Sequence, residues 1–289
     1  MSAIRPISAL NQPMPKAGAD APIGIFDSGI GGLSVAQEIA KYLPNEHIVY
    51  FADTANVPYG ARSDQNIREL TAHAIEWLYR QGCKVAVVAC NTASAFSLDS
   101  LRAHYGENFP IIGLVPALKP AVLQSKSKTV AVLATPATFR GKLIKDVMLR
   151  FAEPNQVKVL PVTSLALVPF VEAGQQMSSD CLATLTEILR PAVDAGADFL
   201  VLGCTHYPFL KSAIYSIFGQ KLTLIDSGLA VARQTARILI KNELFFEQCR
   251  QDAVRLECFV SGQNAEQLKP ILSHLIQADL TWNIANLGV

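Results

Sequence analysis

Short apolar runs alternate with segments of helical periodicity along most of this chain, and this alternation restricts the fold more than any other feature. The runs are rich in β-branched and other apolar side chains, as expected for strands buried on both faces. Strands that alternate with helices build parallel α/β sheets. We therefore predict an α/β fold with strands at Ile23–Phe26, Ile48–Phe51, Val85–Ala89, Ile111–Leu114, Val130–Leu133, Val157–Leu160, Phe199–Leu202 and Leu222–Ile225.

Two of these runs end in cysteines at matching points. Cys90 follows Val85–Ala89, and Cys204 closely follows Phe199–Leu202. Strand ends of this kind line the ligand crevice of an open parallel sheet. If the two halves of the chain pack face to face, one thiol can remove a proton from a carbon while the other returns a proton to the opposite side. This pattern indicates a racemase or an epimerase.

The composition excludes several other classes. The 289 residues are enough for two lobes, and a net charge of +1 gives no reason to expect a nucleic acid or a membrane as partner. No apolar run approaches a membrane span and the first 22 residues lack the pattern of a signal peptide, so we expect a cytoplasmic protein. The remaining cysteines are expected to be reduced core residues: Cys83, Cys181, Cys249 and Cys258.

A glycine-rich turn follows the first strand, at residues 27–34 (DSGIGGLS). Its backbone amides would suit an anion at the start of a helix. The turn nearly matches a dinucleotide fingerprint, with Asp53 placed for a ribose, but Ser34 replaces the third glycine and Asp27 would lie beside the pyrophosphate. A nicotinamide cofactor is therefore not favoured. The plainer alternative is a tight turn capped by Asp27.

Further motifs leave alternatives open. Cys204 resembles a hydrolase nucleophile, but His206 stands where the nucleophile elbow needs a glycine. The cysteine spacing does not favour zinc. Residues 57–60 (VPYG) form either a binding loop or an ordinary turn. Asp226-Ser227-Gly228 repeats residues 27–29, which indicates an internal duplication or two similar helix caps.

Four segments together resemble the signature set of the bacterial glutamate racemases. They are residues 26–35 (FDSGIGGLSV), 57–60 (VPYG), 89–94 (ACNTAS) and 203–206 (GCTH). The likeness covers about residues 23–228 together with a C-terminal helical tail. Paired cysteine motifs occur across the wider aspartate/glutamate racemase superfamily, whereas the glycine-rich and Pro-Tyr-Gly motifs are specific to the glutamate enzymes. Aspartate racemase is therefore the alternative.

The resemblance implies two pseudo-symmetric α/β lobes with the active site in the cleft between them. It implies a first lobe at residues 23–115 plus 227–289 and a second lobe at residues 116–226. The Pro/Ala-rich residues 1–22 are expected to form a flexible extension. A proline-containing segment, Phe109–Lys128, is the candidate hinge between the lobes.

The resemblance also implies the site residues. Cys90 and Cys204 would be the two acid–base groups, with Asp27 assisting near Cys90, and His206 and Glu172 near Cys204. Ala173 follows Glu172 where many members carry a second acid, and Ala134 stands where many carry glycine before a Thr-x-x-Thr segment. Besides Asp27 and His206, the substrate contacts would be Ser28, Pro58, Tyr59, Gly60, Asn91, Thr92, Thr135, Thr138 and Thr205.

The implied activity is the racemisation of L-glutamate to D-glutamate for peptidoglycan synthesis. No metal, pyridoxal phosphate or other cofactor is expected, because neither cysteine segment supplies metal spacing or a Schiff-base lysine. A nucleotide-linked cell-wall precursor as activator and a homo-oligomer are further expectations. A two-lobed protein that only binds a small acid is the alternative from another class, but such a protein has no use for two opposed thiols.

Overall fold

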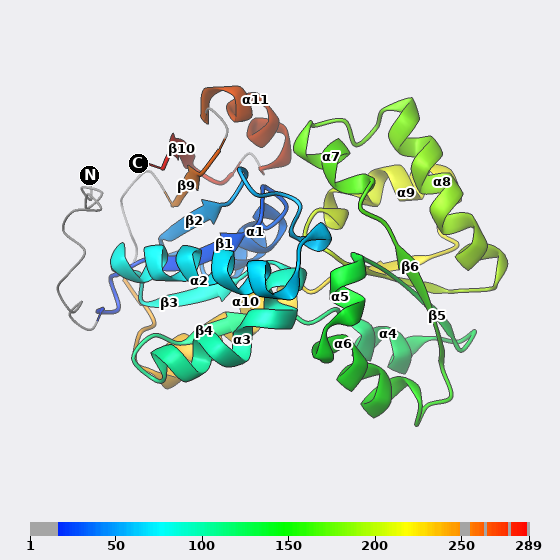
Figure 1. The fold of residues 1–289 in the computed structure, drawn as a ribbon, viewed down its shortest axis with the longest axis horizontal. Coiled ribbons are helices and arrows are strands. Elements are labelled where there is room, and N and C mark those ends of the chain that lie inside the picture. Colours follow the sequence, from blue (N-terminus) through cyan, green and yellow to red (C-terminus); the bar gives the residue numbers. More distant parts are fainter. Residues whose placement is uncertain (1–16, 249–254, 263–264, 277–278, 288–289) are drawn as a thin grey trace.

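The computed structural model describes residues 17–248, 255–262, 265–276 and 279–287. Within these ranges, ten strands form two parallel sheets, each covered by helices on both faces (Figure 1). We call the six-stranded sheet with its helices the first lobe and the four-stranded sheet with its helices the second lobe. The predicted α/β fold with two lobes is confirmed. Most of the extension predicted at residues 1–22 lies outside the described residues, as does Cys249.

The first sheet has the strand order β10-β9-β2-β1-β3-β4. Its strands are β1 (Ile23–Asp27), β2 (Ile48–Ala52), β3 (Val85–Val88), β4 (Ile111–Gly113), β9 (Leu256–Val260) and β10 (Trp282–Asn286). The helices that cover it are α1 (Leu33–Tyr42), α2 (Asp64–Arg80), α3 (Asn91–Tyr105), α10 (Gly228–Lys241) and α11 (Ala265–Leu275).

The second sheet has the order β6-β5-β7-β8. Its strands are β5 (Thr129–Ala134), β6 (Lys158–Thr163), β7 (Phe199–Gly203) and β8 (Thr223–Ile225). The helices of this lobe are α4 (Leu118–Gln124), α5 (Pro136–Arg140), α6 (Lys142–Val147), α7 (Leu167–Glu172), α8 (Ser179–Asp194) and α9 (Lys211–Phe218). Short helical turns occur at η2 (Tyr59–Ala61), η3 (Met148–Ala152) and η4 (Tyr207–Leu210).

Successive side chains of each strand point to opposite faces of the sheet, so every strand contributes to the core on both faces. In β1, Ile23 and Ile25 pack against α1 and α10, whereas Phe26 points to the opposite face and packs against α2 and α3. In β5, Ala131 and Leu133 face α7 and α8, and Val132 faces α4. Both faces are apolar because helices cover both, and this explains why the strands appear in the sequence as continuous apolar runs.

The lobes share one strand order. β2-β1-β3-β4 in the first sheet has the same sequence of positions as β6-β5-β7-β8 in the second. β3 therefore corresponds to β7, and the two cysteine segments that follow them are equivalent. The repeated Asp-Ser-Gly is not a trace of this symmetry, because Asp27 ends β1 whereas Asp226 follows β8, the counterpart of β4.

The C-terminal part is not the helical tail implied by the resemblance. It contributes β9 and β10 to the first sheet, and β9 pairs directly with β2. β10 is an edge strand with no fully buried residue, so its sequence lacks the apolar run that marked the other strands. The chain passes between the sheets from β4 to β5, within the segment predicted as a hinge.

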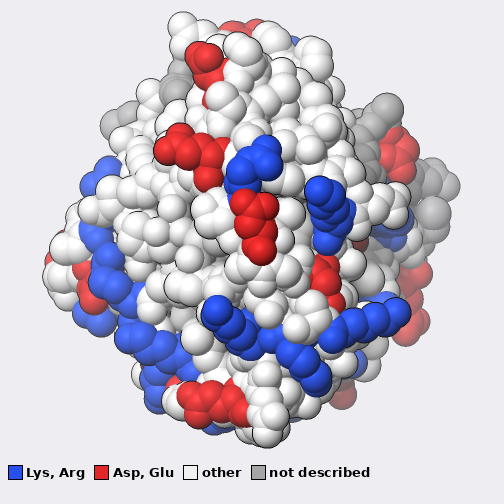
Figure 2. Space-filling model, turned by 90° about the vertical axis from the view of Figure 1, so that its right-hand side faces the viewer, with Lys and Arg blue, Asp and Glu red and all other residues white. Residues whose placement is uncertain are grey.

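The side of the molecule formed by the second lobe carries charges of both signs. In Figure 2, basic side chains run as a broken row across the lower half of this face, with acidic groups above and below it. This mixture agrees with the net charge of +1. None of the described helices is both long enough and apolar enough to cross a membrane.

Candidate active site

Cys90 lies where β3 leads into α3. Its extended backbone makes it the N-cap of that helix, and its Sγ accepts a hydrogen bond from the Ala93 amide at 3.5 Å. The thiol also donates to Ser28 Oγ at 3.6 Å. Burial and the nearby charge of Asp27 raise the pKa of this thiol well above its ordinary value, although the Ala93 amide and Ser28 act in the opposite direction. Burial and the Asp27 carboxylate therefore both favour the protonated thiol at Cys90.

Cys204 directly follows β7 and faces a histidine. Its Sγ lies 3.7 Å from His206 Nδ1, and His206 Nε2 lies 2.6 Å from Glu172 Oε1 at the end of α7. A carboxylate can only accept a hydrogen bond, so the nitrogen that faces it must carry the hydrogen. Glu172 therefore fixes the neutral His206 ring in the tautomer with its hydrogen on Nε2. Nδ1 then accepts from the Cys204 thiol, or donates to the thiolate once the ring is protonated.

The His206 ring is buried, and its neighbours determine how readily it is protonated. Burial acts to lower the pKa of His206, but the hydrogen bonds to Cys204 and Glu172 raise it well above its ordinary value. The protonated ring is therefore available beside the thiol. A protonated histidine next to a cysteine stabilises the thiolate, which is the reactive form.

The glycine-rich turn binds two carboxylates of the chain itself. The Ile30 amide donates to Glu172 Oε1 at 2.9 Å, and the Gly32 amide donates to Asp27 Oδ2 at 2.7 Å. The anion that the sequence pattern predicted at this turn is thus supplied internally. Because Glu172 belongs to the second lobe and Ile30 to the first, the turn also joins the lobes.

Asp27 is fully buried at the end of β1. Burial raises its pKa to about 6, against the opposing effects of His206 and the Gly32 amide. The Thr205 hydroxyl of the second lobe donates to both carboxylate oxygens, at 3.4 and 3.3 Å. Near neutral pH this carboxyl group can therefore take up or release a proton.

These groups border a cleft of about 280 Å³ between the lobes. Eleven of the predicted site residues line it, together with Val168: Ser28, Pro58, Tyr59, Gly60, Cys90, Asn91, Thr92, Thr135, Cys204, Thr205 and His206. The other three predicted residues lie immediately behind them. Asp27 contacts Thr205, and Glu172 contacts His206. Thr138 contacts Thr92 and Thr135.

Three threonine hydroxyls meet across the lobes on one wall of the cleft. Thr92 Oγ1 lies 2.9 Å from Thr135 Oγ1 and 3.4 Å from Thr138 Oγ1, and the last two lie 3.0 Å apart. Asn91 adds an amide nitrogen that is buried without a hydrogen-bond partner. Such a group carries a desolvation cost unless a ligand accepts from it.

Two residues near the cleft had not been predicted for this site. Val168 occurs in an apolar helix and looked like an ordinary core residue, so only the packing of α7 reveals it. Asp53 accepts the Tyr59 hydroxyl at 2.6 Å and also hydrogen bonds from Asn56 and Ser261. Its carboxylate is therefore engaged in fixing the Tyr59 loop and not placed as the ribose-binding acid of the dinucleotide alternative.

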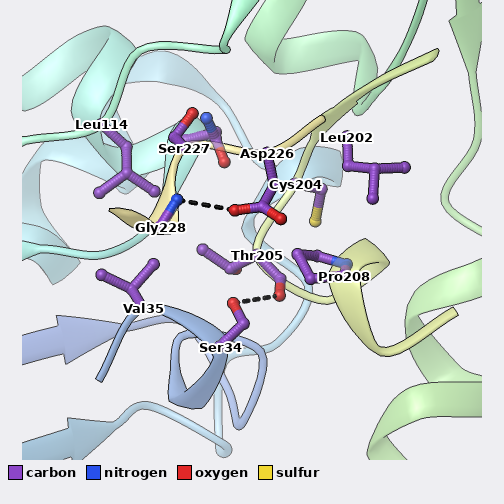
Figure 3. Close-up of a pocket in the computed structure, with 11 residues that line it drawn as sticks. Ser34, Val35, Leu114, Leu202, Cys204, Thr205, Pro208, Asp226, Ser227 and Gly228 are labelled. Carbon is purple, nitrogen blue, oxygen red and sulfur yellow. Dashed lines mark hydrogen bonds between the residues drawn. The ribbon is translucent and has the colours of Figure 1, made fainter. Parts of the chain in front are cut away.

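A second cavity of about 210 Å³ lies behind Cys204 and shares Asn91, Cys204 and Thr205 with the cleft (Figure 3). There Ser34 Oγ donates to the Thr205 carbonyl at 2.9 Å. Nowhere among the described residues do three or more His, Cys, Asp or Glu side chains form a group that could hold a metal ion.

A parallel α/β fold in two lobes, with a thiol at the equivalent strand end of each, defines the class of two-lobed amino-acid racemases. Residues 23–235 match the model of the Asp/Glu/Hydantoin racemase family. The chain is 54% identical to the glutamate racemase of Deinococcus radiodurans over 237 residues, which cover 82% of this chain and 80% of that relative. It is 48% identical to the glutamate racemase of Ralstonia pickettii over 89% of both chains.

Solved structures agree with these relatives. Escherichia coli glutamate racemase, solved with L-glutamate and the activator UDP-MurNAc-Ala, has a TM-score of 0.79 and 34% identity and covers 93% of this chain and 99% of its own. The Thermus thermophilus enzyme with β-chloro-D-alanine has a TM-score of 0.72 and 33% identity, covering 93% and 98%. The chain belongs to the aspartate/glutamate racemase family and is an amino-acid racemase, so the resemblance seen in its sequence is confirmed.

Proposed function

We propose that this protein interconverts L- and D-glutamate without a cofactor, by proton transfer between two thiols and the α-carbon. The observation that carries the proposal is the position of Cys90 and Cys204, which lie at equivalent strand ends of the two lobes and line one cleft. One thiolate removes the α-proton while the opposite thiol donates its own proton to the other side of the carbon. The two cysteines exchange protonation states in each turnover.

The carbanion-like charge of the transition state spreads onto the α-carboxylate, and the cleft must stabilise it there. No Lys or Arg occurs among the residues found to line the cleft. Hydroxyl and amide donors perform this task instead, with the unpartnered Asn91 nitrogen and the threonine cluster as the groups available. Cleft closure makes these hydrogen bonds stronger, because water is excluded.

The two thiols are activated in different ways. Cys204 transfers its proton to His206, whose ring is oriented and stabilised by Glu172. Cys90 has no histidine partner among the described residues, and Asp27, with its pKa raised to about 6, is the group that exchanges a proton on that side. Activation of a thiol by a neighbouring base is a general requirement of such catalysis.

Glutamate is the proposed substrate and aspartate the alternative within the family. The relatives named glutamate racemase support glutamate. One methylene group changes recognition in a pocket by about 10- to 200-fold, so both acids must be compared directly. The alternative of a protein that only binds a small acid is set aside, because the chain belongs to a racemase family.

We further propose the biological setting that the relatives suggest. D-glutamate would supply peptidoglycan synthesis in the cytoplasm, where the thiols stay reduced. The activator bound by the Escherichia coli enzyme supports activation by a nucleotide-linked cell-wall precursor in this protein too. Residues 23–115 plus 227–289 and residues 116–226 are the proposed lobe boundaries.

The test is incubation of the purified protein with L-glutamate in heavy water, without any addition. We expect the optical rotation to fall to zero and deuterium to enter the α-position of the product. The same experiment with L-aspartate should proceed at least about 10-fold more slowly. A protein that stays inactive on glutamate even when a nucleotide-linked cell-wall precursor is added, or faster conversion of aspartate, would contradict the proposed substrate.

A further inference from the structure

Adjacent glycines of the glycine-rich turn pack against the two different acid–base groups of the site. A β-carbon at position 31 would overlap His206 Nδ1 and lie 2.6 Å from His206 Cε1. A β-carbon at position 32 would lie 2.6 Å from Asp27 Cβ and 2.8 Å from Tyr50 Oη. Non-bonded carbon atoms prefer separations of about 3.5–4.0 Å, so neither position has room for a side chain.

Backbone conformation does not explain these glycines. The glycines with positive φ occur at other positions, and neither Gly31 nor Gly32 is among them. Any residue could therefore adopt the local backbone. The need for glycine at both positions comes from the close approach of the acid–base groups, one from each lobe.

The amides of the same turn fix the carboxylates attached to those groups. The Ile30 amide holds Glu172 Oε1, which in turn holds the His206 ring, and the Gly32 amide holds Asp27 Oδ2. The second Glu172 oxygen is buried without a partner, so this carboxylate depends on the turn and on His206 for its hydrogen bonds. The turn thus contacts the acid–base groups of both thiols within three residues, Ile30 to Gly32.

We propose that Gly31 and Gly32 are positioning residues, each for the acid–base groups that serve one of the two thiols. Gly31 sets the position of His206 and Glu172 relative to Cys204, and Gly32 sets the position of Asp27 on the Cys90 side. The turn therefore determines the balance between the two opposite proton transfers. This inference rests on the two-thiol reaction proposed above.

The experiment measures elimination from the two enantiomers of β-chloroalanine. A thiolate takes the α-proton, the C–H electron pair forms the double bond, and chloride leaves with the C–Cl pair; water then converts the aminoacrylate to pyruvate and ammonium. Pyruvate is measured for each enantiomer, and the ratio of the two rates reports which thiol is working. Cys90→Ser and Cys204→Ser supply the two reference directions of this ratio.

Gly31→Ala should shift the ratio in the direction of Cys204→Ser, and Gly32→Ala in the direction of Cys90→Ser, each by about 10-fold or more, since a positioned acid–base group contributes about 10²–10⁴-fold. Gly24→Ala is the matched control. Its β-carbon would crowd Cys83 at the other end of β1, 3.1 Å from Sγ, and should lower stability without changing the ratio.

Equal ratios in both turn variants, or a shift in the same direction, would overturn the inference while leaving the reaction intact. If the two serine variants themselves share one preference, the two-thiol reaction fails, and this inference fails with it. Should Gly31→Ala not fold, Glu172→Asp replaces it, because the shorter side chain withdraws from the Ile30 amide without crowding the turn. It should shift the ratio as Cys204→Ser does, and an unchanged ratio would exclude positioning through Glu172.

Discussion

The His206 ring and the Glu172 carboxylate lie in close contact beside the cleft, with 2.6 Å between Nε2 and Oε1. The same oxygen accepts a hydrogen bond from the Ile30 amide of the first lobe at 2.9 Å, and this second contact forms only when the lobes are together. Proton handling at Cys204 is thereby linked to closure of the cleft. Enzymes often complete their catalytic groups in this way.

Replacement of His206 or Glu172 should slow turnover more than it weakens binding. His206→Asn removes the group that accepts the Cys204 proton, so we expect kcat to fall about 100-fold with little change in KM. Glu172→Gln keeps an oxygen for the Ile30 amide but removes the charge that supports protonated His206, so the pKa of His206 should fall. Steady-state kinetics across pH measures both effects. A raised KM at unchanged kcat would assign these residues to binding instead.

Asp27→Asn should make the protein more stable and less active. Burial raises the pKa of Asp27 from its ordinary value of 3.8 to about 6 in the folded protein. Between pH 3.8 and about 6, this carboxyl group is therefore protonated in the folded protein and ionised in the unfolded chain. Stability from this group is full below pH 3.8 and falls as pH rises through about 6, a loss of about 3 kcal/mol at neutral pH.

Urea unfolding at several pH values measures this effect. The asparagine variant keeps an acceptor for the Gly32 amide and should lose the decrease in stability between pH 4 and 6. A stability curve with the same pH dependence as the wild type would show that Asp27 is not the titrating group.

Thr135→Val should weaken substrate binding through loss of one hydroxyl of the threonine cluster. The hydroxyl contacts both Thr92 and Thr138 on the cleft wall, and a hydrogen bond contributes about 0.5–1.5 kcal/mol. We expect KM for glutamate to rise about 10-fold. Thr135→Ser, which keeps the hydroxyl, is the matched control. An equal rise in KM in both variants would show that the effect does not come from the lost hydroxyl.

Activity should survive removal of small molecules. Dialysis against a chelator should leave the rate unchanged, because the proposed reaction uses only thiols, His206 and carboxyl groups. Thiol alkylation should inactivate the enzyme, and glutamate should protect it by occupying the cleft that Cys90 and Cys204 line. Loss of activity on dialysis that pyridoxal phosphate or a metal restores would overturn the mechanism.

The strand pattern predicted the fold well where helices cover both faces of a sheet. All eight predicted runs are strands, although β6 extends to Thr163 beyond the predicted end at Leu160. β9 and β10 were missed because polar residues interrupt their apolar runs, once in LECFV of β9 and twice in WNIAN of β10. The place of β9 beside β2 depends on contacts across more than 200 residues, which no local pattern contains, and β10 then pairs with β9.

The site could be predicted as a set of residues but not as an arrangement. The resemblance named the residues that line the cleft and placed His206 and Glu172 near Cys204, yet the hydrogen bonds that hold these groups between the lobes were hidden. Nothing near Ile30 in the sequence indicates that its amide would hold Glu172, because 142 residues separate them. Similarly, the spacing that suggested a ribose-binding Asp53 could not show that Tyr59 and Ser261 occupy its carboxylate.

The account stands on two thiols acting from opposite sides of one carbon, and the enantiomer preference of Cys90→Ser and Cys204→Ser tests it most directly. Each variant should lose nearly all racemisation, because a hydroxyl is a far weaker base than a thiolate. Each should still eliminate chloride from β-chloroalanine, but only from the enantiomer whose α-hydrogen faces the surviving thiol. We predict opposite preferences for the two variants. The same preference in both, or full racemisation in either, would contradict the pairing of these cysteines across the substrate.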